Sequence, residues 1–347
     1  MKITRTGILV SAFAVAAVAA VAAVAATAEA QEHLPVIDMH LHALAADSQG
    51  PPPVAMCTPL APFPVWDPAG PYEATFMAMV KQPPCKDPVW SPGTDEALMN
   101  QTIEVMKRRN VFGVLSGTPD RVATWMEAAP GRFYAGLGLR VGGSTTPSVD
   151  SVRALKARGR LAVLAEVTNQ YAGIAPDDER MEPYWTLAEE LDLPVGIHIG
   201  PGPPGVIYLG ESGYRARLHS PLGLEEVLVR HPALRVYIMH AGFPFLDDLL
   251  ALLYAHPQVH VDVGVIVFSQ SRASFYRYLQ GIVEGGFGKR VMFGSDQMVW
   301  PGVIERSIAV IEEASFLSQA QKRDILYDNA ARFLRLSERE IATHHGK

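Results

Sequence analysis

The sequence predicts an α/β fold, a (β/α)8 TIM barrel, from two observations. Eight short apolar runs alternate with helix-length segments along the chain, a pattern typical of parallel strands joined by right-handed crossovers. Eight such units are the number that closes a barrel, and 347 residues are enough for one barrel with insertions. A doubly wound open sheet is the alternative, but it usually has fewer strands, and no G-x-G-x-x-G motif opens the first helix.

The expected elements follow one another from residue 34 onward. Strands are expected at 34–42, 111–115, 133–139, 161–166, 194–199, 234–240, 259–263 and 290–296. Helices are expected at 94–109, 119–129, 149–157, 182–191, 221–230, 245–255 and 273–283, and two more at 303–313 and 318–336 close the chain. Each strand is followed by a helix, directly or after an insertion, so the βα unit repeats along the chain.

The first 30 residues have the features of a signal peptide. Lys2 and Arg5 precede a run of alanine and valine at 7–26, and a small-residue cleavage pattern follows at 28–30. An uncleaved anchor is the alternative, because about 20 apolar residues can span a bilayer. Alanine is only weakly apolar, so cleavage is the expectation. A single domain at 31–347 would then be periplasmic or secreted, with no stable membrane span.

Composition excludes several classes of protein. With 48% hydrophobic and 19% charged residues, the chain resembles folding proteins and differs from disordered ones. The formal net charge is −6, whereas nucleic-acid binders carry a clustered basic face, so no nucleic-acid partner is expected. No long apolar run follows the leader, which excludes a polytopic membrane protein. The expected partner is a small-molecule substrate, and a homodimer stays open.

Residues 43–93 form a proline-rich insertion after the first strand. Proline clusters at 51–53 and 83–84 forbid central strands and long helices, so a long loop is expected there. Both cysteines, Cys57 and Cys85, lie in this segment, and in an exported protein such a pair favours a disulfide over two unrelated apolar residues. Because the insertion leaves the end of a barrel strand, we expect a lid that shapes the pocket. A surface excursion that only shields the barrel is the alternative.

Polar residues stand at the ends of the strand runs, where a barrel places its active site. In a strand, side chains at i and i+2 point to the same face, so His40 and His42 point together at the end of the first run. The fourth, fifth, sixth and eighth runs end in Glu166, His198, His240 and Asp296. Closing the barrel therefore brings all six side chains around one mouth.

A single histidine in an apolar strand is more often a buried structural residue than a ligand. The combination of an H-x-H pair with two further histidines and an aspartate is far more specific than any one member. Three imidazoles and a carboxylate suit Zn²⁺, and a catalytic site keeps one position open for water. The sequence therefore predicts a metal-dependent barrel, with Zn²⁺ as the expected metal and Mn²⁺ as an alternative.

These motifs make the sequence similar to the amidohydrolase superfamily, and more narrowly to the amidohydrolase-2 branch that includes aminocarboxymuconate-semialdehyde decarboxylase and related decarboxylases and hydrolases. The matching segments are 37–42 (IDMHLH), 197–200 (IHIG), 239–244 (MHAGFP), 293–296 (FGSD) and 329–334 (NAARFL). The resemblance covers the chain after the leader except for the insertion. It implies a metal bound by His40, His42, His198 and Asp296. His240 would then polarise the substrate or the attacking water.

Glu166 departs from the pattern of that superfamily. Members with two metals often have a carboxylated lysine at the end of the fourth strand, where this chain has a glutamate. Glu166 could bridge two metals, act as a general base beside one, or orient a neighbouring histidine. One tightly bound metal is the favoured expectation, and a second metal stays open.

Five further polar residues are weaker candidates for a role at the site. His260 and Asp262 share a face of the seventh strand and are expected to face the barrel interior, where Asp262 could orient a metal ligand. Asp38 is expected to be structural. His344 and His345 are expected to lie in a frayed tail.

Four residues near strand ends are candidates for binding the substrate. Arg215 and Arg217 lie in the loop after the fifth strand, where they could clamp a substrate carboxylate. A solvated surface is the alternative for these two arginines. Tyr171 and Trp300 follow strand ends and could form walls of the pocket.

The expected reaction is hydrolysis of an amide, ester or lactone by metal-activated water. Asp296 would take the proton of that water and His240 would stabilise the developing oxyanion, with Glu166 as a further acid–base candidate. Non-oxidative decarboxylation of an aromatic or enoic acid is the alternative, and the ligand set does not separate the two reactions. A metal-binding scaffold without activity is a third hypothesis, but an open ligand set at a barrel mouth has no evident structural purpose.

Overall fold

The computed structural model describes residues 33–143 and 145–347. Within it, the chain from Pro35 to Lys347 forms one compact unit. The signal peptide expected at residues 1–30 lies outside the described residues. Among the helices of the described part, none is long and apolar enough to cross a membrane.

All eight expected strands are present, and each pairs in parallel with its neighbours. They are β1 (Val36–Ala43), β4 (Val111–Gly117), β5 (Phe133–Ala135), β6 (Leu164–Val167), β7 (Val195–His198), β8 (Val236–Met239), β9 (Val259–Asp262) and β10 (Val291–Met292). The strands form two sheets, in the orders β1-β4-β5 and β10-β9-β8-β7-β6. Nearly all of their residues are buried, which is typical of strands covered on both sides. The predicted α/β barrel class is therefore confirmed.

Hydrogen bonds link the two sheets at both seams. At one seam, two isolated parallel bridges pair Gly136 with Val163 and Leu139 with Val167. The segment after β5 therefore pairs with β6 and with the residue that precedes β6. At the other, the amide of Met39 donates to the carbonyl of Phe293 over 2.9 Å, and the amide of Asp296 donates to the carbonyl of His40 over 2.8 Å. The end of β1 consequently lies beside the segment that follows β10, so two predicted metal ligands become neighbours.

Strand β1 carries one more residue than β4 in the paired region. Asp38 lies opposite Gly113, whereas Leu41 lies opposite Leu115, so the register shifts between them. A bulge of this kind redirects the side chains that follow it. In a regular strand, Asp38 would share a face with His40 and His42. The bulge interrupts this alternation, and Asp38 is not among the described residues that line the cavity at the mouth.

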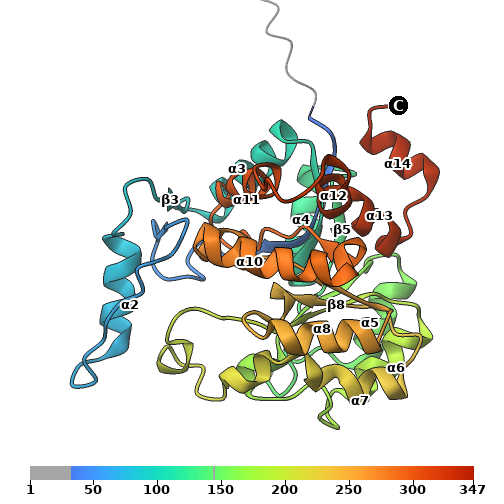
Figure 1. The fold of residues 1–347 in the computed structure, drawn as a ribbon, viewed down its shortest axis with the longest axis horizontal. Coiled ribbons are helices and arrows are strands. Elements are labelled where there is room, and N and C mark those ends of the chain that lie inside the picture. The colour runs from blue at the N-terminus through green and yellow to red at the C-terminus, as the bar shows by residue number, and fades with distance from the viewer. Residues whose placement is uncertain (1–32, 144) are drawn as a thin grey trace, which may run out of the picture. The chain divides into compact units, whose positions relative to one another are not determined.

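Helices pack around the strands, as Figure 1 shows. The main ones are α3 (Asp95–Arg108), α4 (Pro119–Ala128), α5 (Val149–Ala157), α6 (Glu182–Glu190), α7 (Glu225–Arg230), α8 (Leu246–Ala255), α10 (Arg272–Ile282) and α11 (Val303–Glu312). Side-chain hydrogen bonds from Thr94, Ser148 and Ser271 cap the starts of α3, α5 and α10. The expected helices are confirmed, with ends that agree closely except in α7.

Two expected helices differ in detail from the prediction, and one further helix was not expected. The first four residues of the helix expected at 221–230 form a 3-10 turn before α7. The helix expected at 318–336 is divided into α12 (Gln319–Arg323), a π-helical turn and α13 (Asn329–Leu334). A short helix, α9 (Ile266–Ser269), follows β9 and has no counterpart in the prediction.

The insertion contains more regular structure than expected. Strands β2 (Ala55–Met56) and β3 (Val89–Trp90) pair antiparallel, and helix α2 (Tyr72–Lys81) stands between them in the chain. The expectation of a loop without a long helix is therefore only partly right. Pro71 precedes α2 and Pro83 follows it, so the prolines bound the helix and do not interrupt its hydrogen bonds.

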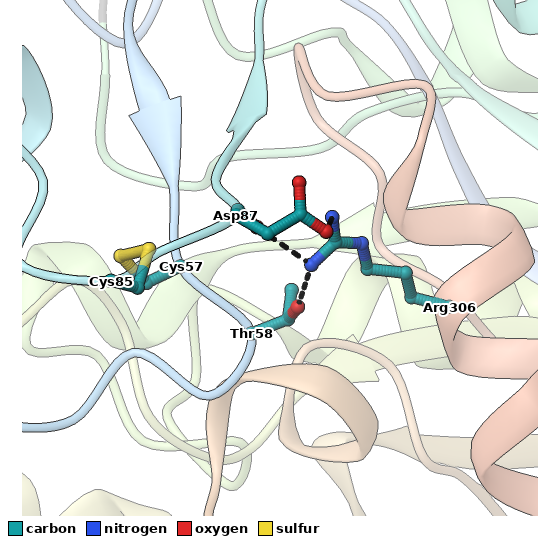
Figure 2. Close-up of a disulfide and its surroundings, with 5 residues drawn as sticks. All are labelled: Cys57, Thr58, Cys85, Asp87 and Arg306. Atoms are coloured by element: carbon teal, nitrogen blue, oxygen red, sulfur yellow. Dashed lines mark hydrogen bonds and ion pairs between the residues drawn. A yellow bond between two sulfur atoms is a disulfide. The ribbon is translucent and has the colours of Figure 1, made fainter.

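A disulfide closes the insertion, and Arg306 ties it to the barrel, as Figure 2 shows. Cys57 and Cys85 form the expected disulfide, with their Cα atoms 5.8 Å apart. Arg306 of α11 donates to the hydroxyl of Thr58 over 2.6 Å and forms an ion pair with Asp87 at 2.7 Å. Thr58 and Asp87 lie within two residues of the cysteines, so the barrel holds the insertion at the point where the disulfide closes it.

The last helix corrects the expectation of a frayed tail. α14 (Glu338–His344) begins with a capping box. The ring of His344 is buried, stacks on Phe112 with centroids 3.7 Å apart, and places Nδ1 3.0 Å from the hydroxyl of Tyr327. Burial lowers the pKa of His344 to about 4, so the ring packs in its neutral form. Of the two histidines expected in the tail, His345 is the exposed one.

Replacing His344 by alanine should lower the free energy of unfolding by about 2–4 kcal/mol, because the change removes a buried ring and leaves a cavity. His345→Ala is the matched control, since that side chain is exposed, and its effect should stay within about 0.5 kcal/mol. Urea unfolding followed by circular dichroism measures both values. Equal effects of the two substitutions would show that His344 does not anchor α14.

Candidate metal centre and active site

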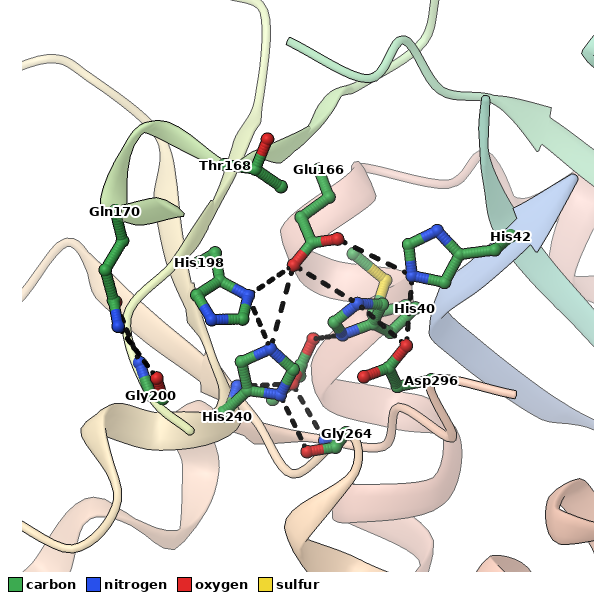
Figure 3. Close-up of polar contacts among 12 residues, drawn as sticks. His40, His42, Glu166, Thr168, Gln170, His198, Gly200, His240, Gly264 and Asp296 are labelled. Carbon is green, nitrogen blue, oxygen red and sulfur yellow. Dashed lines mark hydrogen bonds and ion pairs between the residues drawn. The ribbon is translucent and has the colours of Figure 1, made fainter. Parts of the chain in front are cut away.

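The structure brings together the six polar residues from the ends of the strands, as Figure 3 shows. His40 and His42 come from β1, Glu166 from β6 and His198 from β7, while His240 directly follows β8 and Asp296 follows β10. Five of the six are buried and Glu166 is partly exposed. The parallel strands thus deliver all six side chains to one end of the barrel.

Glu166 lies at the centre of the cluster. Its Oε1 is 2.6 Å from Nδ1 of His198, 3.7 Å from Nε2 of His240 and 3.8 Å from Nε2 of His40. Its Oε2 is 3.6 Å from Nε2 of His42. The carboxylate therefore faces all four imidazoles from one position.

Asp296 borders the cluster on the side of β1. Its Oδ1 lies 3.0 Å from Nε2 of His42 and 3.6 Å from Nε2 of His40. Burial alone would raise the pKa of Asp296, but the charge of His40 and a hydrogen bond from His42 lower it. Burial likewise opposes ionisation of Glu166, yet hydrogen bonds from the imidazoles, that of His198 first, hold its pKa well below the usual range. Both carboxylates are therefore anionic at neutral pH.

Contacts behind the cluster fix the orientation of two imidazoles. Nδ1 of His40 donates to Oδ2 of Asp262 over 3.1 Å, and Nδ1 of His240 donates to the carbonyl of Gly264 over 2.9 Å. The other oxygen of Asp262 accepts from the amides of His240 and Gly264. Because each Nδ1 is engaged in these bonds, each Nε2 is the nitrogen that remains available to the cluster. Asp262 thus orients His40, as the sequence predicts, whereas His260 bonds only a nearby carbonyl.

Further hydrogen bonds tie β1 to the segment after β10. Asp38 accepts from the amides of His40 and Ser295, in both cases over 2.9 Å. Burial raises the pKa of Asp38 to about 7. Gln297 accepts from the amide of His42 and donates to its carbonyl. Asp38 is thus structural, as expected, while no pattern in the sequence singles out Gln297.

Strained backbone marks two of the six residues. His240 has a φ of 63° and Asp296 a φ of 53°, in the left-handed region that residues with a side chain seldom occupy. Gly264 lies so close to His40 that a Cβ at this glycine would be 2.6 Å from Nδ1 of the imidazole. Strain of this kind persists only where the surroundings enforce it, and it is concentrated at functional sites.

The donor set fits a divalent cation. Nε2 of His40 is buried and has no hydrogen-bond partner among the described residues. One group of ligand atoms within 4.8 Å of one another comes from His40, His42 and Asp296, and a second comes from Glu166, His198 and His240. Imidazole and carboxylate donors in this arrangement suit Zn²⁺. The site is therefore a candidate metal centre, as the sequence predicts.

The cluster opens into a cavity of about 1330 Å³. Four of the six residues line it, namely His42, Glu166, His198 and Asp296. The insertion supplies a large part of the wall, including Met56, Phe63, Phe76 and Met77. The insertion therefore lines the cavity beside the metal centre, and it is more than a surface excursion.

Tyr171 and Trp300 both line this cavity, at the positions where the sequence predicts pocket walls. The ring of Tyr171 lies 4.8 Å from that of His198, and burial raises its pKa, so the phenol is neutral. The indole of Trp300 donates to the carbonyl of Val54 over 2.9 Å. Trp300 thus joins the barrel to the insertion at the wall of the cavity.

The structure corrects the expectation of a clamp formed by Arg215 and Arg217. Neither is among the described residues that line the cavity. The guanidinium of Arg215 donates to two carbonyls of its own loop, and Arg217 is exposed. Among the residues that the structure describes, the arginine that lines the cavity is Arg140. It directly follows the strand expected at 133–139, so the rule that strand ends carry functional residues would have identified it.

A hydrogen-bonded network beside the cluster has no signal in the sequence. Nε2 of His219 lies 2.6 Å from the hydroxyl of Tyr214, which donates to the carbonyl of Gly200. The side chain of Gln170 bonds both the amide and the carbonyl of Gly200. His219 lines the cavity, and burial lowers its pKa to about 4. A lone histidine in a loop resembles a solvated residue, so only the fold reveals it.

The amidohydrolase-2 family model (amidohydrolase) matches residues 37–336. The chain belongs to the amidohydrolase family. The match begins in β1 and ends after α13, so it includes all six residues of the candidate metal centre. The resemblance expected from the sequence is confirmed, and the protein is an enzyme of this family.

Solved amidohydrolase-like structures share the fold at low identity. A probable 2-pyrone-4,6-dicarboxylic acid hydrolase from Acinetobacter baumannii is 16% identical, with a TM-score of 0.53 over 87% of this chain and 99% of that chain. 5-Carboxyvanillate decarboxylase from Sphingomonas paucimobilis is 17% identical, with a TM-score of 0.52 over 88% and 100%. An amidohydrolase from Burkholderia multivorans with bound zinc is 16% identical, with a TM-score of 0.53 over 87% and 100%. Among curated proteins, none matches this chain.

Asp262→Asn should weaken metal binding by about 10–100-fold, because the amide offers no charged acceptor to Nδ1 of His40. Asp324→Asn is the matched control, since Asp324 is also buried but pairs with Lys289 outside the metal centre. Competition with a chelator measures the affinity, and mass spectrometry of the metal gives the content per chain. An affinity unchanged by Asp262→Asn would contradict the orienting role of this carboxylate.

Replacing Cys57 and Cys85 by serine should raise KM or broaden the substrate range, because the wall formed by the insertion loses its covalent closure. Metal content should stay constant, since all six residues of the metal centre lie outside the insertion. Steady-state kinetics of the oxidised protein, the reduced protein and the double variant test this. If thermal stability falls and the kinetics do not change, the insertion is a structural element and not a lid.

Proposed function

We propose that the protein is a zinc-dependent hydrolase that cleaves an amide, ester or lactone bond of a small molecule. The observation that carries the proposal is the convergence of four imidazoles on Glu166, with Asp296 beside His40 and His42 and with no hydrogen-bond partner for Nε2 of His40 among the described residues. Membership of the amidohydrolase family supports a metal-dependent reaction. The pyrone hydrolase and the zinc-containing amidohydrolase of the same fold support hydrolysis and zinc.

The proposed metal ligands are His40, His42, His198 and Asp296, with Glu166 as a further ligand or a base beside them. When bound, a divalent cation supplies Lewis acidity, which lowers the pKa of water from about 15.7 to near 7 and draws charge from a carbonyl oxygen. One cation per chain is proposed, because Glu166 faces all four imidazoles and can share a single ion with them.

The proton transfers are assigned to residues of the cluster. Asp296 lines the cavity beside His42, so its carboxylate can accept a proton from an attacking water. His240 has its Nδ1 bonded to Gly264 and its pKa is raised, against the effect of burial, by a hydrogen bond with Glu166, so Nε2 of the protonated ring is the atom that would donate to a developing oxyanion. Tyr171 lines the cavity next to His198, where its ring would pack against the substrate.

Non-oxidative decarboxylation of an aromatic or enoic acid is the second candidate. The decarboxylase of the same fold supports it, and it would use the same ligand set. Arg140, the one arginine among the described lining residues, is already paired with Glu211, so a substrate carboxylate that does not reach the metal would find no free cationic side chain there.

Export to the periplasm or secretion is also proposed, with removal of the leader after residues 28–30. The disulfide between Cys57 and Cys85 supports this location, because such bonds persist in oxidising compartments and are rare in the cytosol. The proposed mature protein is a single barrel domain at 31–347.

Product analysis distinguishes the two reactions. Protein loaded with Zn²⁺ is expected to cleave members of a panel of lactones, esters and N-acyl compounds, and to release no CO₂ from aromatic acids. Protein loaded with Mn²⁺ gives the metal comparison and chelator-treated protein the blank. Asp296→Asn should abolish turnover, whereas Asp324→Asn should retain it. Release of CO₂ without cleavage of any ester, lactone or amide would overturn the proposal in favour of decarboxylation.

A further inference from the structure

Apart from the metal centre, the wall of the cavity is mostly apolar. It includes Leu44, Met56, Leu60, Phe63, Phe76 and Met77. Of the lysines and arginines that the structure describes, only Arg140 lines the cavity, whereas the acidic residues Glu73 and Glu211 both do. An ionised substrate group in this space would lose its hydration and find a single cationic side chain outside the metal centre.

That single cation already has a partner. Nη1 and Nη2 of Arg140 donate to Oε1 and Oε2 of Glu211 over 2.9 Å and 2.5 Å, which is a bidentate pair. Arg140 lies in the segment between β5 and α5, and Glu211 lies in the loop between β7 and α7. The two side chains are 45% and 28% exposed, so a ligand that enters the cavity can reach the pair and compete for the guanidinium.

We propose that Glu211 sets the charge preference of the site: by neutralising Arg140, it makes the cavity select bulky, uncharged acyl compounds over carboxylated ones. The inference rests on the proposed hydrolase function and names its substrate class. A free arginine would bind a substrate carboxylate in the bidentate geometry that Glu211 now uses. With Glu211 in place, an anionic substrate must displace the carboxylate of Glu211 from Arg140. The two negative charges would then lie side by side, and their repulsion disfavours the anionic substrate.

The test compares two esters that share the scissile acetyl bond, 4-acetylphenyl acetate and 4-carboxyphenyl acetate. The first carries an uncharged acetyl group where the second carries a carboxylate of similar size. Zn²⁺-loaded wild type is expected to prefer the uncharged ester at least 10-fold in kcat/KM. Glu211→Gln should raise the relative kcat/KM of the carboxylated ester about 10-fold, because it frees Arg140. The double variant Arg140→Gln, Glu211→Gln should lose that gain.

Glu190→Gln is the matched control for the loss of an ion pair. Arg153 and Glu190 form the same bidentate geometry between α5 and α6, with both distances 2.7 Å, and neither residue is among the described residues of the cavity wall. This substitution should leave the ratio of the two esters unchanged. Thermal unfolding of every variant establishes that each chain is folded before kinetics are compared.

Failure of the inference and failure of the hydrolase proposal give different results. A wild type that prefers the carboxylated ester, or a ratio that Glu211→Gln does not change, overturns the inference and leaves hydrolysis standing. If no variant cleaves either ester, calorimetric titration with benzoate and acetophenone takes the place of kinetics. Glu211→Gln should then tighten binding of benzoate alone, and only while Arg140 is present. Equal tightening of both ligands, or none, overturns the inference on binding.

Discussion

Three carboxylates, those of the partly exposed Glu166 and of the buried Asp262 and Asp296, lie among four imidazoles at the end of the strands. Burial opposes the ionisation of Glu166 and Asp296, so nearby positive charge has to compensate them. In the protein without a cation, protons supply this charge. Burial alone would lower the pKa of His40, but the charges of Asp296 and Asp262 raise it well above its usual value. The negative charges of Asp296 and Asp262, which keep His40 protonated, would also attract a metal ion.

The geometry around the cluster follows from holding these charges in place. Asp262 can face His40 only because Gly264 has no side chain in the space beside the imidazole. Asp296 reaches the cluster from a strained backbone whose amide is bonded to the carbonyl of His40. Asp38 then ties the amide of His40 to that of Ser295. The seam between β1 and β10 is thus held by the same residues that shape the metal centre.

The sequence predicts the parts of this arrangement that depend on local patterns. Apolar runs mark all eight strands, and polar residues at their ends mark the cluster, because parallel strands deliver their ends to one mouth. Other features depend on partners that are distant in the sequence. Helix α2 forms between prolines that locally suggest a loop, and His344 is buried only because Phe112 receives its ring. The direction of a loop arginine such as Arg215 is likewise set by carbonyls of the folded loop.

The metal centre can assemble without the disulfide that closes the insertion. The cluster residues all lie outside the insertion, so the barrel can assemble them while Cys57 and Cys85 are still thiols. Before oxidation, the wall depends on contacts such as those of Arg306 and Trp300. In a compartment that keeps thiols reduced, the chain would have all of its proposed metal ligands, but the insertion that lines the cavity would lack its disulfide. If the chain is exported as proposed, formation of the Cys57–Cys85 disulfide would be the step that completes the wall of the pocket.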